Sequence, residues 1–329
     1  MRTLLLVLVM GLQACAAMRT GRSEVSILVD LDPARADRSV IVEAITADKA
    51  GRLYLPDRVS GNVLRIDPEA PRPVVVGRIE PREIKGKKVG ADAGGLAFNG
   101  QGDLLIAAGG FSEVLRIRAS ELDPGKPGRA ETFATGVPGA NAVALDRRGN
   151  LYVSGGRAGK IYRVGPGGGA AQPIVQIPPH SRKVPGGGVQ PIVENGLAFD
   201  ANGVLHVADT ARGAIWKVPI SADGAVGKPV MLAQSPLLEG ADGIEFDARG
   251  TLWVAANERN AIATVAPDGS VREVWKNDSR GPLEFPSGIV FVGGTAYVSN
   301  FDVPRRDNLD SSGKTALDGI GASVAMIVP

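Results

Sequence analysis

Four acidic and amide residues recur at one register of this chain. Glu43, Asn141, Asn195 and Asp242 each open a short, alternating apolar segment, eight residues before a glycine in a turn. Equivalent positions in a repeated fold occupy equivalent places, so we expect these side chains to converge. Two carboxylates and two amides are hard oxygen donors of the kind that Ca²⁺ prefers. The pattern therefore predicts a divalent-metal site, with calcium as the expected ion.

The charges of the ring residues and the positions of the histidines limit which metal this site could hold. Without a cation, Glu43 and Asp242 would repel each other in a partly desolvated channel. The two histidines of the chain, His180 and His206, stand outside this register, which argues against a histidine-based zinc site. The alternative is that the four residues cap strands or bind channel water, because Asn and Asp before Gly are common in turns. The shared register favours the metal.

The elements that must position these residues are repeats. A strand–turn–strand pattern occurs six times, at intervals of 45 to 54 residues, over 43–55, 94–106, 141–153, 195–207, 242–254 and 287–298. A repeat of about 40 to 50 residues with strand content is typical of β-propeller blades. We therefore predict an all-β fold, a six-bladed β-propeller. The first residues of the copies are expected to point at the mouth of the central channel; they are Glu43, Gly94, Asn141, Asn195, Asp242 and Ser287.

Local signals inside the copies agree with this fold. An Asp-x-x-Gly turn, as in Asp146–Gly149, joins the first two strands, with the Asp side chain capping the turn and the Gly at positive φ. Alternating third strands follow at 63–66, 114–117, 161–164 and 214–218. No convincing amphipathic helix is found. We expect Glu24–Val29 to pair with Ala322–Val328 and close the ring, because propellers usually join their chain ends in one blade.

The length, composition and net charge of the chain limit the possible folds and partners. The 329 residues suit one large all-β domain, 44% of them are hydrophobic, and 44 glycines beside 5% aromatics suit many tight turns. A formal net charge of +2 is too small to indicate nucleic acid or an anionic membrane surface as a partner. We expect a monomer that acts on a small molecule.

The N-terminus has the form of a targeting segment. Arg2 precedes an apolar run of nine residues, Leu4 to Leu12, which is too short to span a bilayer. We assign 1–17 as a signal peptide and 24–329 as the propeller domain. The run 12–15 resembles a bacterial lipobox, in which Cys15, the only cysteine, would be lipidated after cleavage before it. The expected location is periplasmic or membrane-anchored through that lipid; the alternative is a soluble secreted protein.

The chain from about residue 40 to 300 resembles the senescence marker protein/gluconolactonase family, which includes regucalcin. The resemblance is carried by Glu43, by Asn141 in Asn-Ala-Val-Ala-Leu-Asp, by Asn195 in Glu-Asn-Gly-Leu-Ala-Phe-Asp and by Asp242 in Ala-Asp-Gly-Ile-Glu-Phe-Asp. It implies hydrolysis of sugar lactones or related esters with a divalent ion bound by Glu43, Asn195 and Asp242. It also implies that Asn141 binds substrate.

The resemblance leaves the substrate open, because the substrate-binding Arg of the family has no match by motif. Within the ring, Asp242 is our candidate for both metal ligand and general base. Gly94 is expected to leave an open wall for a bulky ligand. The alternative function is a non-catalytic periplasmic propeller that serves as a binding module; a strictosidine-synthase-like propeller is a weaker third choice, because that chemistry needs a different acidic site.

Other polar residues have plainer interpretations. Asp57, Asp209 and Asn300 stand at the ends of second strands, where they are expected to cap turns. His206 takes the place that Tyr or Trp holds in other copies, so we expect it to pack in the core. His180 is expected in a solvated loop.

Overall fold

The tight turns that join the first two strands of blades 1, 3, 4 and 5 arise from an aspartate and a glycine, and Asn99 takes the place of the aspartate in blade 2. In the Asp146–Gly149 turn, the Asp146 carboxylate accepts hydrogen bonds from the backbone N–H groups of Arg148 and Asn150, both at 2.9 Å. Gly149 has φ of +80°, a conformation that glycine adopts without steric cost. The same geometry recurs in the other full copies, with Gly51, Gly102, Gly203 and Gly250 at φ of 78–83°. The sequence prediction of these hairpins is therefore confirmed.

The computed structural model describes residues 24–33, 39–156, 158–184, 188–221, 223–303, 308–312 and 321–328. The predicted signal segment with Cys15 lies outside the described residues. Within them the regular structure is strand, apart from four 3₁₀ turns at 109–111, 119–121, 236–238 and 257–259. No helix in the described ranges is long and apolar enough to cross a membrane.

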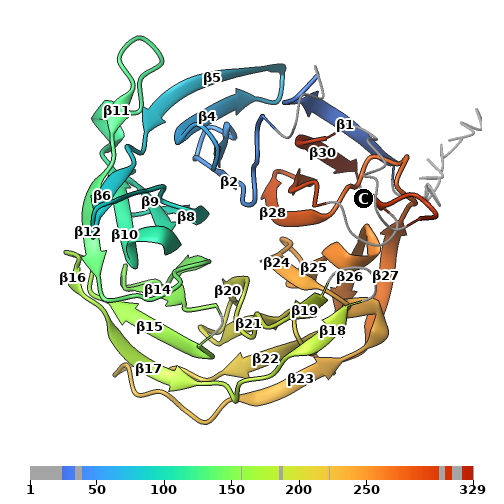
Figure 1. Ribbon diagram of the computed structural model, residues 1–329. Helices are drawn as coiled ribbons and strands as arrows, with labels where there is room; N and C mark the ends of the chain where they lie inside the picture. Colours follow the sequence, from blue (N-terminus) through green and yellow to red (C-terminus); the bar gives the residue numbers. More distant parts are fainter. Residues whose placement is uncertain are drawn as a thin grey trace, which may run out of the picture.

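The strands form six antiparallel sheets that are arranged around a central axis (Figure 1). Blades 1 and 2 each carry a short fifth strand that pairs in parallel with the outermost regular strand. Blade 1 contains β2 (Thr46–Ala47), β3 (Leu53–Pro56), β4 (Asn62–Asp67), β5 (Ala70–Arg78) and β11 (Gly128–Arg129); blade 2 contains β8 (Ala93–Phe98), β9 (Leu104–Ala108), β10 (Glu113–Ile117), β12 (Glu131–Thr135) and β16 (Gly169–Ala170); blade 3 contains β13 (Val143–Leu145), β14 (Leu151–Ser154), β15 (Lys160–Val164) and β17 (Gln172–Gln176).

The second half of the ring repeats this plan. Blade 4 contains β20 (Leu197–Phe199), β21 (Leu205–Asp209), β22 (Ala214–Val218) and β23 (Val230–Gln234); blade 5 contains β24 (Ala241–Phe246), β25 (Leu252–Ala256), β26 (Ala261–Val265) and β27 (Val271–Lys276); blade 6 contains β28 (Pro286–Val292), β29 (Thr295–Asn300), β30 (Ser323–Val328) and β1 (Glu24–Asp30). Two hairpins lie outside the blades: β6 (Arg82–Ile84) with β7 (Lys87–Val89), and β18 (Arg182–Val184) with β19 (Gly188–Gln190). The prediction of a six-bladed propeller is confirmed.

The ring closes where the two ends of the chain meet. β1 pairs antiparallel with β30, so that Glu24 lies opposite Val328 and Asp30 opposite Ser323. The N-terminal strand thereby becomes the outermost strand of blade 6, as the sequence suggested. This closure joins the last blade to the first part of the chain.

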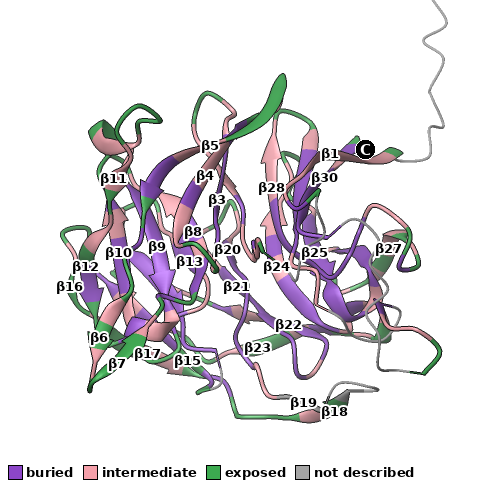
Figure 2. Cartoon of the chain, turned by 45° about the horizontal axis from the view of Figure 1, so that its top comes forward, coloured by how far each residue is buried: buried purple, intermediate pink, exposed green. Residues whose placement is uncertain are grey.

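Neighbouring blades pack through a repeated aromatic contact. The second strand of one blade presents a ring that meets a phenylalanine of the next blade edge to face, with centroids 4.9–5.4 Å apart. The pairs are Tyr54–Phe98, Tyr152–Phe199, His206–Phe246 and Trp253–Phe291. His206 is buried in this packing position, as expected, and His180 is exposed. Buried residues accordingly concentrate in the inner strands, and exposed ones in loops (Figure 2).

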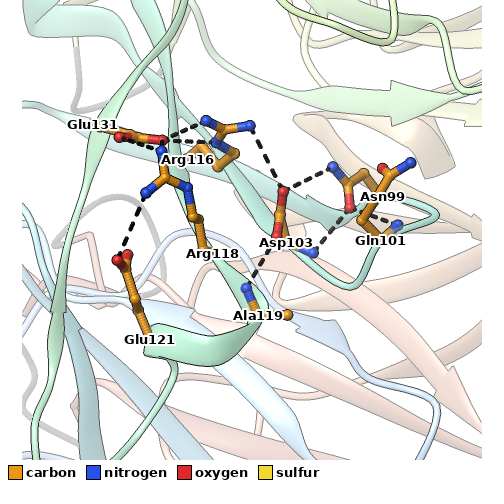
Figure 3. Close-up of polar contacts among 8 residues, drawn as sticks. All are labelled: Asn99, Gln101, Asp103, Arg116, Arg118, Ala119, Glu121 and Glu131. Atoms are coloured by element: carbon orange, nitrogen blue, oxygen red, sulfur yellow. Dashed lines mark hydrogen bonds and ion pairs between the residues drawn. The ribbon is translucent and has the colours of Figure 1, made fainter.

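Charged residues on the outer strands of blade 2 form a surface ion-pair network (Figure 3). Arg116 on β10 contacts Glu131 on β12 and lies 3.8 Å from Asp103, while Arg118 lies 2.8 Å from the same Glu131. These residues line neither of the cavities of the central channel. They stabilise the hairpin locally and offer controls for changes in the channel.

Candidate functional site

The register predicted from the repeats brings four polar residues together on the channel axis. Glu43, Asn141, Asn195 and Asp242 line a cavity of about 660 Å³ at one end of the channel. The same four residues also line a second cavity, of about 390 Å³, at the other end. They therefore surround the channel where the two cavities adjoin. The larger cavity forms the candidate site.

In blades 2, 4, 5 and 6 a glycine follows the ring residue, and it explains how neighbouring blades come so close. The backbone N–H of Gly196 donates to the carbonyl of Asp242 at 3.1 Å, and that of Gly95 donates to the carbonyl of Asn141 at 2.6 Å. A Cβ at Gly196 would stand 2.3 Å from the Asp242 oxygen. Only glycine permits this approach, so Gly95 and Gly196 link blades 2 and 4 to the ring residues of blades 3 and 5.

Two expectations about the ring are wrong. Gly94 lines the cavity, but a Cβ there would stand 2.4 Å from the carbonyl oxygen of Asn141. Its lack of a side chain thus serves contact between blades and does not leave an open wall. Ser287 is buried, and its hydroxyl donates to the backbone carbonyl of Glu43. It therefore does not reach the larger cavity.

Hydrogen bonds fix the orientation of the ring side chains. Thr210 donates its hydroxyl proton to the carbonyl of Ala241 at 2.6 Å, so its oxygen must accept from Nδ2 of Asn195, which lies 3.0 Å away. Because the nitrogen of the Asn195 amide is engaged there, its Oδ1 remains the atom that can bind a cation. Asn257 donates from Nδ2 to Oδ2 of Asp242 at 2.9 Å, which holds that carboxyl in place.

The two carboxyl groups oppose each other's ionisation. Burial raises the pKa of Asp242 well above its usual value, and the charge of Glu43 raises it further, while the hydrogen bond from Asn257 lowers it. Burial also raises the pKa of Glu43; the guanidinium of Arg58 lowers it, and Asp92 raises it. Asp242 is only 5% exposed. Both carboxylates can be charged together only when positive charge lies near them.

Sequence reasoning missed Arg58, which lies in the loop between β3 and β4. Its guanidinium forms ion pairs with Glu43 and with Asp92 and lies 5.3 Å from the centre of the Phe301 ring. Asp92 is largely exposed, with 61% of its side chain accessible. The site thus already contains one cation, which neutralises part of its negative charge.

A signal for Arg58 and Asn257 is present in the repeats. Both stand 15 residues after the ring residue of their own blade, and Thr210 does the same in blade 4. The position directly follows the second strand, beside Asp57 and Asp209. Those two carboxylates cap the turns, as expected: Asp57 accepts from the N–H groups of Ile41 and Val59, and Asp209 from that of Arg212. A second ring of residues therefore lies above the first.

The donor set fits a divalent cation. Glu43, Asn195 and Asp242 come from blades 1, 4 and 5 and offer two carboxylates and one amide oxygen, which suits Ca²⁺. Within the described ranges, no group of three or more His, Cys, Asp and Glu residues is close enough to hold a metal; the third ligand here is an amide, which such a group does not include. The mutual repulsion of the carboxyls favours a cation between them.

Part of the chain matches the model of a known family. The family model of the SMP-30/gluconolactonase/LRE-like region matches residues 188–299. This span includes Asn195 and Asp242 and excludes Glu43 and Asn141. A search of curated proteins finds no match.

Solved structures resemble the chain over nearly its whole length. A gluconolactonase from Xanthomonas campestris has a TM-score of 0.65 and 17% identity, covering 94% of this chain and 90% of that one. The calcium-binding protein regucalcin from Agrobacterium tumefaciens has a TM-score of 0.62 and 18% identity, covering 92% and 94%. Virginiamycin B lyase from Staphylococcus aureus has a TM-score of 0.59 and 12% identity, covering 93% and 99%. At these identities the likeness is one of fold, and the fold hosts more than one reaction.

The resemblance read from the sequence is confirmed by the family model over residues 188–299, and the fold is confirmed by the structural neighbours.

Proposed function

We propose that this chain, a propeller carrying the SMP-30/gluconolactonase/LRE-like region, is a divalent-metal-dependent hydrolase of lactones or related esters. One observation carries the proposal: Glu43, Asn195 and Asp242, from three different blades, meet at the floor of a cavity of about 660 Å³. A non-catalytic binding propeller has no need for two buried carboxylates that oppose each other's charge. The cavity size suits a small molecule.

Glu43, Asn195 and Asp242 would hold the cation, with calcium expected. When bound, the cation supplies positive charge that stabilises the oxyanion of an attacked carbonyl. The like-charge contact between Glu43 and Asp242 supports this assignment. The same contact makes the two carboxyls a poor pair in the absence of a cation, since one of them would then keep its proton.

The residues of the chain supply the proton transfers. Asp242 is our candidate general base: it takes a proton from a water molecule as the water oxygen bonds to the lactone carbonyl carbon. When the tetrahedral intermediate collapses, the ring C–O bond breaks and Asp242 returns the proton to the leaving alkoxide. Asn257, which donates to Asp242, keeps that carboxyl directed at the cavity. Asn141, which lines the cavity, is our candidate for holding the substrate.

Export is part of the proposal. The charged start at Arg2, the short apolar run and Cys15 support a lipoprotein signal. Lipidation of Cys15 would anchor the propeller at the outer face of a membrane, where it would act on small molecules outside the cytoplasm. Metabolic labelling with a radioactive fatty acid, compared with a Cys15→Ala variant, tests this; equal labelling of both proteins would refute it.

The test of the enzyme proposal is a calorimetric titration of Ca²⁺ into chelator-treated protein, followed by lactone hydrolysis. Asp242→Asn should lose most calcium affinity and most activity while it keeps the wild-type melting transition. Asp123→Asn, in an exposed loop, is the matched control and should keep both. If calcium does not bind, or binds equally to the wild type and Asp242→Asn, the channel is not a metal site, and a non-catalytic binding propeller becomes the better explanation.

A further inference from the structure

The candidate cavity has two chemically different parts. One part carries Glu43, Asn195 and Asp242, with Arg58 beside them and the largely exposed Asp92 towards solvent. The other part is lined by apolar residues from opposite sides of the ring: Phe285, Phe301 and Val303 beside blade 6, and Pro138, Pro191 and Ile192 beside blades 3 and 4. Blades 6 and 3 face each other across the axis (Figure 1). We call this apolar part of the lining the collar and the part around Glu43, Asn195 and Asp242 the floor.

In the aromatic part of this collar, the backbone of Phe285 has a strained conformation. Phe285 has φ of +50°, a left-handed conformation that is unfavourable for a bulky residue and is concentrated at functional sites. Two hydrogen bonds maintain it: its N–H donates to Oδ1 of Asn260 at 2.8 Å, and its carbonyl accepts from the N–H of Phe301 at 3.1 Å. The hydrogen bond between the two backbones therefore links the strained conformation of Phe285 to the position of Phe301.

The two rings also connect the collar to the charged floor. Phe285 and Phe301 lie 6.3 Å apart between centroids, tilted by 47°. The guanidinium of Arg58 lies 5.3 Å from the Phe301 ring centre while it pairs with Glu43. The aromatic rings therefore lie next to the charged groups of the floor, where a ligand that reacts at the floor can contact them.

We infer that the substrate is a lactone or ester with an apolar substituent next to the reacting carbonyl group, such as an alkyl-substituted lactone, in preference to a polyhydroxylated sugar lactone. This inference rests on the proposed hydrolase function. Sugar hydroxyls placed against Phe, Val, Ile and Pro side chains would lose their hydration without gaining hydrogen bonds. An alkyl chain in the same place gains the free energy of burial.

Charge supports a neutral substrate. The ionisable groups that line the described part of the cavity are Glu43, Arg58, Asp92 and Asp242. With all of them charged, a bound divalent cation makes their sum zero. Among the described lining residues no surplus positive charge then remains to attract an anionic ligand, which agrees with an uncharged lactone.

The experiment compares δ-lactones that differ only in alkyl chain length, together with glucono-δ-lactone, using the full-length protein loaded with Ca²⁺ and a proton-release assay. From δ-valerolactone to δ-decalactone, kcat/KM should rise by about three- to fourfold per buried methylene until the collar is covered. δ-Decalactone should exceed glucono-δ-lactone. Hydrolysis of glucono-δ-lactone with a flat or falling alkyl series would overturn the inference and leave the proposed function intact. No hydrolysis of any lactone would overturn both.

Variants of the collar locate the effect. Val303→Ser and Phe301→Ala should lower kcat/KM for δ-decalactone more than for δ-valerolactone, mainly through KM. Val59→Ser is the matched control, because Val59 is 54% exposed and lies outside the candidate cavity. An equal loss for both substrates in the collar variants, or the same loss in Val59→Ser, would contradict the collar as the specificity element. Thermal melts identify any variant that merely unfolds.

Discussion

At the proposed metal site Arg58 would compete with the cation for Glu43, and its replacement should therefore tighten calcium binding. The guanidinium forms ion pairs with Glu43 and Asp92, and the Arg58 and Glu43 side chains are only 19% and 13% exposed. We expect a cation coordinated by Glu43 to weaken this contact, which Arg58 makes with one of the two carboxylate oxygens. A hydrogen bond to a charged group contributes about 1.5–3 kcal/mol, so Arg58→Gln should lower the Kd for Ca²⁺ by roughly 10- to 100-fold.

The same variant should destabilise the metal-free protein, because Glu43 is left buried without its partner. Calorimetric titration of chelator-treated protein measures the affinity, and thermal melting with and without Ca²⁺ measures the stability. Arg116→Gln is the control: it breaks a comparable ion pair on the outer strands of blade 2 (Figure 3) and should leave calcium affinity unchanged. Unchanged or weaker calcium binding by Arg58→Gln would refute the competition.

Three further predictions concern the surroundings of the ring. Asn257→Ala removes a hydrogen bond that lowers the pKa of Asp242, so the acid limb of the kcat/KM profile should move to higher pH; an unmoved limb would exclude Asn257 as a positioning residue. Burial raises the pKa of Glu194 from 4.5 to about 8, so the folded state binds this proton more tightly than the unfolded chain, and stability falls as the pH rises between these values. The melting temperature of Glu194→Gln should therefore rise relative to that of the wild type between pH 5 and pH 8.5. A difference in melting temperature that does not change with pH would contradict the raised pKa of Glu194. Gly196→Ala forces a Cβ against the Asp242 carbonyl and should lower stability by about 1–3 kcal/mol and also weaken calcium binding. Gly90→Ala, with open space around it, is the control and should change neither stability nor calcium affinity. Equal melting temperatures of the two variants would contradict the close approach of the blades.

Much of the fold could be predicted because its signals are local. The turn glycines, the alternating strands and the repeat interval all depend on residues within about 50 positions of one another. The positions of Glu43, Asn141, Asn195 and Asp242 on the axis followed from the same repeat, since equivalent residues of equivalent blades must occupy equivalent places. Their roles as ligands, base or substrate contact remain predictions.

The failures concern contacts between blades. Gly94 was assigned to an open wall, because nothing in its own repeat indicates that the carbonyl of Asn141 approaches it. Ser287 shares the ring register, yet its hydroxyl bonds to the backbone of Glu43, 244 positions away, across the seam that joins the last blade to the first. Such a contact exists only once the ring has closed.

By itself, then, the sequence determined the number of blades, the register of the ring and the kind of donor atoms on the axis, because a repeated pattern specifies short-range strand geometry. Only the tertiary structure decided the pairing of Arg58 with Glu43, the support of Asp242 by Asn257 and the collar formed by Phe285, Phe301 and Val303. These depend on which side chains meet over the channel when the blades pack. Closure of the ring brings together residues from separate blades whose neighbourhood no local pattern encodes.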